Sequence, residues 1–178
     1  YALIGRLVGS EMCIRARYGP HGIDLIKRND GRYQLGVINH YPDETIEMFE
    51  MVKKENSWNM VWRGCIDVPY EFYFNDISLR KNGSFYASHM YDREITLNEW
   101  LLVSIIKTDT GFLVEWIENK FKKIDGSDGS GPNGIALDEN SNIIYISYNQ
   151  GDSITKFDLS LNKKLDKKFI EAPDNPYI

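Results

Sequence analysis

The stretch Tyr18–Leu25 reads Tyr-Gly-Pro-His-Gly-Ile-Asp-Leu, and altered copies of it recur along the 178-residue chain. Phe74–Leu79 reads Phe-Asn-Asp-Ile-Ser-Leu, and Pro132–Asp138 reads Pro-Asn-Gly-Ile-Ala-Leu-Asp. A last partial copy, Pro173–Ile178, reads Pro-Asp-Asn-Pro-Tyr-Ile. A polar residue, His or Asn, thus recurs at the head of short apolar runs. This recurrence predicts a radial repeat in which all the heads point toward one centre.

Around the first copy, alternation of apolar and polar residues predicts four antiparallel strands. They are expected at residues 22–27, 33–39, 45–52 and 58–66, with Asp30-Gly31 in the first hairpin turn. The second unit is expected to hold strands at 76–80, 84–89, 100–107 and 112–117, with a charged loop at 90–99. After a glycine-rich linker at 125–131, the third unit is expected at 134–138, 143–148, 153–159 and 165–170.

The heads recur at intervals of about 40 to 60 residues, and four strands per interval is typical of a β-propeller blade. We therefore predict an all-β fold with blades at about 18–67, 72–124 and 131–171, and the start of a fourth at 173–178. Propellers have about four to eight blades, so we expect the chain to be a fragment of one longer propeller domain. Residues 1–17 do not fit the pattern and are predicted to be a leader of doubtful origin or a remnant strand.

The overall composition excludes several classes of partner. The net charge is −5 and no basic block occurs, which argues against nucleic acid. No apolar run approaches the roughly 18 to 20 residues needed to span a bilayer. Cys13 and Cys65 form either one disulfide or two buried thiols, and they lack the partner spacing of a zinc site. The compartment is not indicated.

The first two strands of each unit form a hairpin, which brings a second polar residue back beside the head of the first strand. The predicted pairs are His21 with His40, Asn75 with His89, and Asn133 with Asn149. All three histidines of the chain fall at these positions. We therefore expect a polar rim around a central channel.

Oxygen ligands that converge on a channel suit a hard cation, and calcium accepts six to eight of them in loose geometry. The candidate ligands are Asn75, Asn133, Asp174 and Asn175. A cation there would polarise a carbonyl group. The His21/His40 pair can act as general base and proton shuttle, because imidazole titrates near neutrality.

Each of these residues also has a purely structural interpretation. An Asn at a strand end commonly serves as a turn or cap residue. His89, a possible rim residue beside Met90, can instead be a packed structural histidine. Asp43-Glu44 and the lysine-rich segment at 163–168 are predicted to be solvated.

An ordered set of short motifs resembles the paraoxonase (arylesterase/lactonase) family. The motifs are Gly19-Pro-His-Gly-Ile23, Val37-Ile-Asn-His40, Ile46-Glu-Met-Phe49, Asn75-Asp-Ile77, Asn133-Gly-Ile135 and Asp174-Asn175. The segment Gly131–Leu159 is also similar to the wider senescence-marker/gluconolactonase-like propellers. The resemblance covers about residues 18–178 and implies a six-bladed propeller, of which this chain would be the middle part.

The resemblance implies two calcium ions and a hydrolase of lactones or aryl esters, which are small-molecule substrates. Asn75, Asn133, Asp174 and Asn175 match the ligands of the catalytic calcium. Asp76 and the backbone carbonyl of Ile23 match ligands of a buried structural calcium. His21 and His40 match the pair proposed to activate the hydrolytic water.

The chain also departs from the family pattern. The acidic calcium ligand of the first blade has no counterpart, His89 replaces a different polar residue, and Pro176 follows Asn175 at a strand head. Two alternatives therefore stay open: a gluconolactonase-like or strictosidine-synthase-like enzyme, and a non-catalytic propeller that serves as an interaction scaffold. The His21/His40 pair favours the paraoxonase type over the first alternative.

Overall fold

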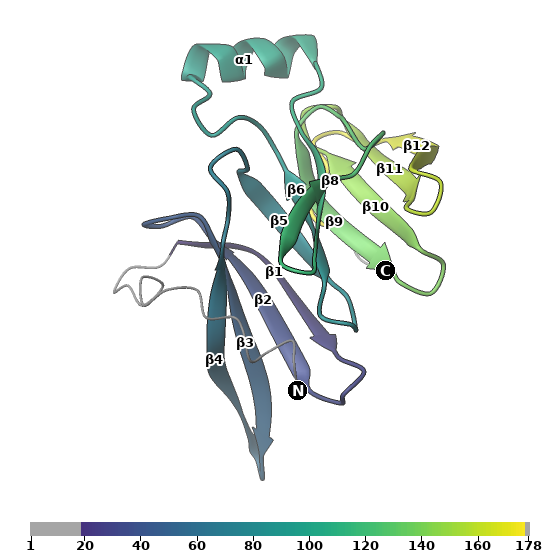
Figure 1. Ribbon diagram of the computed structural model, residues 1–178. Helices are drawn as coiled ribbons and strands as arrows, with labels where there is room; N and C mark the ends of the chain where they lie inside the picture. Colours follow the sequence, from purple (N-terminus) through teal and green to yellow (C-terminus); the bar gives the residue numbers. More distant parts are fainter. Residues whose placement is uncertain (1–18, 177–178) are drawn as a thin grey trace.

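The computed structural model describes residues 19–176, which form three four-stranded antiparallel sheets and one helix (Figure 1). In each sheet the four strands lie in chain order. The chain is therefore a partial β-propeller with three blades, which confirms the predicted fold class. The predicted leader at 1–17 lies outside the described residues, and the predicted domain boundaries stay a prediction.

The strands agree with the predicted ones to within a few residues, except in the second blade. The first blade contains β1 (Pro20–Lys27), β2 (Tyr33–Asn39), β3 (Thr45–Lys54) and β4 (Ser57–Asp67). The second contains β5 (Phe74–Leu79), β6 (Phe85–His89), β7 (Phe112–Ile117) and β8 (Lys120–Lys123). The third contains β9 (Pro132–Asp138), β10 (Ile143–Tyr148), β11 (Ser153–Asp158) and β12 (Lys163–Phe169).

The strand predicted at residues 100–107 is wrong, because this segment lies in helix α1 (Leu97–Ile106). Thr96 and Glu99 form a capping box: the Thr96 hydroxyl accepts from the Glu99 N–H at 3.3 Å, and the Glu99 carboxylate accepts from the Thr96 N–H at 2.9 Å. Lys107 ends the helix in the left-handed conformation, with φ 53°. None of the helical residues is buried. No helix among the described residues has the length and apolarity to cross a membrane.

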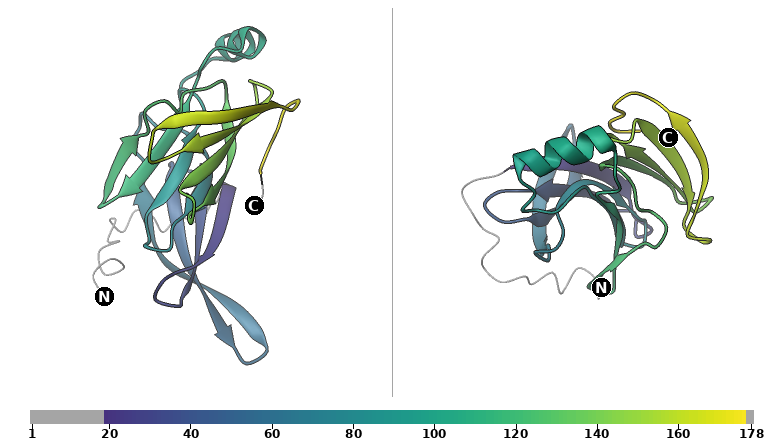
Figure 2. Two further views of the ribbon diagram at one scale, coloured as in Figure 1. Left: turned by 90° about the vertical axis from the view of Figure 1, so that its right-hand side faces the viewer. Right: turned by 90° about the horizontal axis from the view of Figure 1, so that it is seen from above.

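The first strand of each blade lies innermost. β1 contacts β5, and β5 contacts β9. β5 is buried along its whole length, whereas β12 is exposed along its whole length. Figure 2 shows the three sheets following one another around the molecule, with β12 at an outer edge. The heads of the inner strands are thereby brought toward one region.

Apolar side chains fill both junctions between blades. Phe74, Phe85 and Trp116 belong to the cluster between the first and second blades, and Tyr86 belongs to the cluster that joins the second blade to Ile146 of the third. Phe85 and Tyr86 are neighbours on β6, so their side chains point to opposite faces of the sheet. The second blade is therefore buried on both faces.

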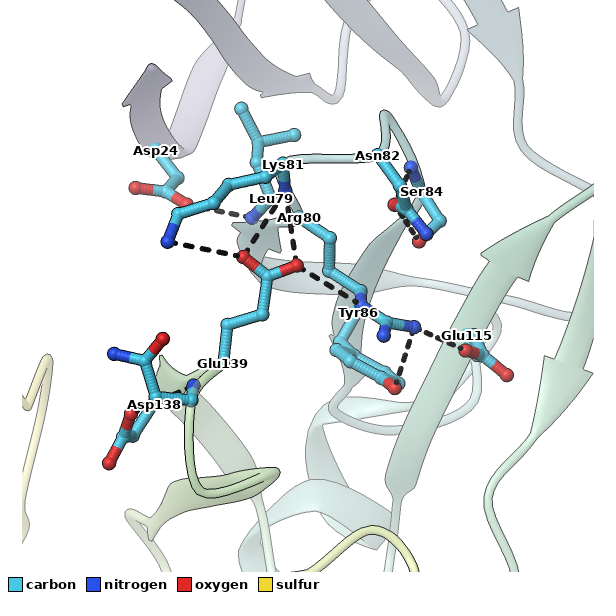
Figure 3. A network of polar contacts seen from close by, with 11 residues as sticks. Asp24, Leu79, Arg80, Lys81, Asn82, Ser84, Tyr86, Glu115, Asp138 and Glu139 are labelled. Atoms are coloured by element: carbon cyan, nitrogen blue, oxygen red, sulfur yellow. Dashed lines mark hydrogen bonds and ion pairs between the residues drawn. The ribbon is translucent and has the colours of Figure 1, made fainter. Parts of the chain in front are cut away.

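Polar contacts join the blades at the ends of the inner strands away from the heads (Figure 3). The Leu79 N–H, at the end of β5, donates to Asp24 Oδ2 of β1 at 2.7 Å. The Arg80 side chain lies between two carboxylates, with Nη1 3.3 Å from Glu115 Oε1 and Nε 3.8 Å from Glu139 Oε1. Because Glu139 follows β9, this network joins the far end of β5 to that of β9, and the Asp24 contact joins it to the middle of β1.

The first blade also carries a cysteine whose state was left open. Cys65 lies in β4, is 3% exposed, and is disulfide-bonded. Cys13 lies outside the described residues.

Candidate functional site

The inner strands and the segment after β12 line an open cavity of about 530 Å³. The polar lining includes His21, Asp24, Asn75, Asp76, Asp174 and Asn175. Of the described residues that line it, none is a lysine or an arginine. The cavity is therefore rich in oxygen ligands and carries negative charge.

The two histidines of the first hairpin are in direct contact. His21 Nδ1 lies 2.9 Å from His40 Nε2, and the two ring centroids are 5.0 Å apart. The His40 N–H donates to the Gly19 carbonyl at 2.9 Å, which closes the hairpin beyond the Pro20–Asn39 pair. Burial, and next the neighbouring His40, lower the pKa of His21. His21 is therefore held as a neutral base near physiological pH.

Glu44 occupies the other side of His40, and the prediction that it is solvated is wrong. Its Oε2 lies 2.8 Å from His40 Nδ1, and its Oε1 accepts from the Phe74 N–H at 3.1 Å. Glu44 is only 6% exposed. The only sequence signal for this contact was that Glu44 lies four residues after His40. That spacing predicts a side-chain contact in a helix, but Glu44 lies in a loop, so the contact was not predictable.

Aromatic rings fix the plane of the His40 imidazole. The His40 ring stacks on Tyr73 with a centroid distance of 4.7 Å and an interplanar angle of 11°. Tyr73 in turn stacks on Tyr91 at 5.3 Å. His40 thus has both ring nitrogens and one ring face in contact with other side chains.

Asp76 is a buried carboxylate at the junction of β5 and β9. Its Oδ2 accepts from the Ile135 N–H at 2.8 Å, and its own N–H donates to Ser88 Oγ at 3.0 Å. Burial raises the pKa of Asp76 to about 6, and the nearby carboxylates of Asp24 and Asp174 contribute in the same direction. These carboxylates would be stabilised by a cation in the cavity.

Two glycines allow the heads of the strands to approach one another. A Cβ at Gly22 would lie 2.5 Å from the carbonyl oxygen of Asn75 and 2.7 Å from Asp76 Oδ1. A Cβ at Gly134 would lie 2.5 Å from Asn175 Cα and 2.6 Å from its Oδ1. Any other residue at either position would push the candidate oxygen ligands apart.

The remaining predicted residues take different positions. Ile23, Asp174 and Asn175 line the cavity. The segment that contains Asp174 and Asn175 is held by Asn149, whose side chain donates to the Pro173 carbonyl at 3.2 Å. Asn133 is partly buried and is not among the lining residues. Its carbonyl accepts from Ser88 Oγ at 2.5 Å.

His89 is not part of the cavity lining. An irregularity between Phe74 and Ile77 shifts the pairing, so that His89 lies opposite Phe74 rather than Asn75. Its Nδ1 accepts from the Tyr73 N–H at 3.0 Å, and its ring centroid lies 4.7 Å from that of Phe112. Burial lowers the pKa of His89. These contacts favour the interpretation of His89 as a packed structural histidine over its interpretation as a residue of the polar rim.

The donor set fits a hard cation better than a transition metal. Among residues 19–176, no group of three or more His, Cys, Asp or Glu side chains is arranged to hold a metal ion. Amide and backbone carbonyl oxygens would have to complete the shell, and calcium accepts both. The uncompensated charge of Asp24, Asp76 and Asp174 around one cavity supports this fit.

Comparison with protein families shows where the chain belongs. The model of the family described as Arylesterase matches residues 7–171 of this chain. No curated protein matches the sequence.

Proposed function

The chain belongs to the arylesterase family, and from this premise we propose that it hydrolyses aryl esters or lactones in the cavity at the heads of the inner strands. The observation that carries the proposal is the 2.9 Å contact between His21 Nδ1 and His40 Nε2 at this cavity. Such a pair, beside oxygen ligands for a cation, supplies both a base and a place for a carbonyl group.

The contacts support one distribution of protons over the pair. Glu44 accepts at Oε2, so His40 Nδ1 carries a proton and His40 Nε2 presents a lone pair. His21 Nδ1 then donates to His40 Nε2. The lone pair of the neutral His21 is therefore on Nε2, which is the atom that can accept a proton from water.

Hydrolysis then follows as a general-base reaction. His21 takes a proton from water as the water oxygen bonds to the carbonyl carbon of the ester or lactone. His21 becomes an imidazolium, whose Nδ1–H remains bonded to His40, and the carboxylate of Glu44 stabilises the charge of the pair. When the ester C–O bond breaks, the proton passes to the departing oxygen, and His21 is neutral again.

The proposal includes two calcium ions. Asn75, Asn133, Asp174 and Asn175 would hold the catalytic ion, and Asp76 with the Ile23 carbonyl would hold the structural one. A bound calcium would withdraw electron density from the substrate carbonyl and stabilise the oxyanion. Asn133 is not among the lining residues, so its side chain would have to turn into the cavity to take part.

Steady-state hydrolysis of an aryl acetate and a δ-lactone, in buffer with calcium, tests the proposal. His21→Gln should lower kcat by about a hundredfold or more, because it removes the general base. His89→Asn is the matched control, since it replaces the histidine that does not line the cavity, and it should keep its activity. The proposal fails if the protein hydrolyses neither class, as a non-catalytic scaffold would, or if His21→Gln is as active as the unmodified protein.

A further inference from the structure

A second cavity, of about 450 Å³, lies between the second and third blades, away from the histidines. Strands β11 and β12 form one wall, and residues from the ends of the β6–β7 and β8–β9 connections form the other. β8 has four residues whereas β12 has seven. The last strand of the second blade is therefore too short to cover the outer strands of the third.

Three residues that line this cavity have a buried hydroxyl group without a hydrogen-bond partner among the described residues. They are Ser130, Ser153 and Thr155, which are 5%, 0% and 1% exposed. A buried polar group that lacks a partner destabilises the fold, and nearly all such groups in native proteins are paired. Three such hydroxyl groups around one cavity are hydrogen-bonding groups that a bound molecule could satisfy.

The strand register places these hydroxyl groups beside lysines. Ser153 and Thr155 are two residues apart on β11 and therefore share a face. Thr155 lies opposite Lys167 of β12, and Ser153 lies opposite Phe169. Hydroxyl donors and an ammonium group thus line the same wall.

The charge of the lining is positive, although the chain as a whole is at −5. Lys107, Lys164 and Lys167 line the cavity, against the two carboxylates of Asp109 and Asp152. Lys107 forms an ion pair with Asp152. The Lys164 ammonium lies 5.1 Å from the centre of the Tyr148 ring, and that of Lys167 lies 5.1 Å from the centre of the Phe169 ring. Lys167 forms no ion pair with a carboxylate among the described residues.

We propose that this cavity is a binding site for a small oxoanion of the phosphate type. A phosphate presents several strong acceptor oxygens to the three hydroxyl groups, and its negative charge matches the excess of lysines. A cation would be repelled by the positive charge of those lysines. A neutral polyol would satisfy the hydroxyl groups but would gain nothing from the charge.

Calorimetric titration with inorganic phosphate tests the site. A chelator is included so that a cation in the first cavity cannot bind the phosphate. Thr155→Val removes one hydroxyl with little change in shape, and it should weaken phosphate binding by about tenfold, as expected for the loss of one hydrogen bond to a charged group. Ser147→Ala is the matched control, because Ser147 is equally buried and unpartnered but does not line the cavity; it should bind phosphate as the unmodified protein does.

A thermal melt separates a binding role from a structural one. Without phosphate, Thr155→Val should melt at the same temperature or higher, because an unpartnered hydroxyl is lost. At equal phosphate concentration, the melting temperature of Thr155→Val should rise less than those of the unmodified protein and Ser147→Ala. The proposal is overturned if phosphate at about 10 mM produces no binding, if Thr155→Val binds as tightly as the unmodified protein, or if glycerol binds where phosphate does not.

Discussion

His40 Nδ1 lies 2.8 Å from Oε2 of Glu44, and this carboxylate is 6% exposed. In the proposed mechanism this contact places the proton of His40 on Nδ1, and through the 2.9 Å contact with His21 it leaves Nε2 of His21 as the base nitrogen. A buried carboxylate that orients a histidine also stabilises the imidazolium that forms during general-base catalysis. Glu44 does not line the cavity, so in the proposed mechanism it would act through His40 and not on the substrate.

The first prediction concerns this carboxylate. Glu44→Gln should lower kcat for ester hydrolysis by about tenfold or more with little change in KM, because the charge that stabilises the histidine pair is lost while the substrate cavity is intact. Glu47→Gln is the control: Glu47 is also a buried carboxylate, but its contacts are with Thr45 and Trp62. Equal kcat in Glu44→Gln and Glu47→Gln would show that Glu44 is only a structural residue.

The second prediction concerns the pH dependence of stability. His89 has a lowered pKa in the folded protein because it is buried, against an ordinary value of 6.5. Below about pH 6.5 the unfolded chain gains a proton that the folded chain resists, so the free energy of unfolding falls as the pH drops, by up to about 1.4 kcal/mol per unit. His89→Asn, which keeps an acceptor for the Tyr73 N–H, should remove this component.

The measurement is a series of urea unfolding curves between pH 4 and pH 8. Asp76 contributes with the opposite sign: its raised pKa of about 6 means that its contribution to stability is lost as the pH rises from the ordinary value of 3.8 through 6. At each pH, the difference in unfolding free energy between the unmodified protein and His89→Asn gives the contribution of His89. A difference that is constant across the series would contradict the buried, neutral state of His89.

The third prediction concerns the approach of the inner strands. Gly22→Ala should destabilise the fold by about 1–3 kcal/mol, because its Cβ would lie 2.5 Å from two backbone atoms of β5 that cannot move independently. Gly36→Ala is the control, since its Cβ would meet only the side-chain ends of Leu79 and Ile77, at 3.0 and 3.2 Å. The urea midpoints of the two variants give the comparison, and a Gly22→Ala variant as stable as Gly36→Ala would mean that the strands are not in close contact at their heads.

Strong local alternation made most of the fold predictable. β2 and β10 have the predicted bounds, because one face of each strand is apolar and turn residues flank them. The contact of His21 with His40 followed from the hairpin symmetry around Asp30-Gly31, with no tertiary information.

The misses have physical causes that a single sequence does not reveal. The apolar run of α1 was mistaken for a strand because it lacks a polar face, and only the Thr96–Glu99 capping box signalled a helix. The register of β5 against β6 shifts between Phe74 and Ile77, so His89 lies opposite Phe74 and not Asn75. This shift by one position turned the His89 side chain away from the cavity. Glu44 became buried because β5, from the next blade, supplies the Phe74 N–H that satisfies it.

Calcium binding measured by calorimetry tests the central claim, that the heads of the inner strands converge on a cation-dependent hydrolytic site. The account predicts that the protein binds calcium and that Asn75→Ala, at the head of β5, weakens the binding by about tenfold or more. Asn140→Ala, in the exposed β9–β10 turn, should bind calcium as the unmodified protein does. An absence of calcium binding, or equal affinities in the Asn75→Ala and Asn140→Ala variants, would contradict the account and leave the asparagines at the strand heads as turn and cap residues.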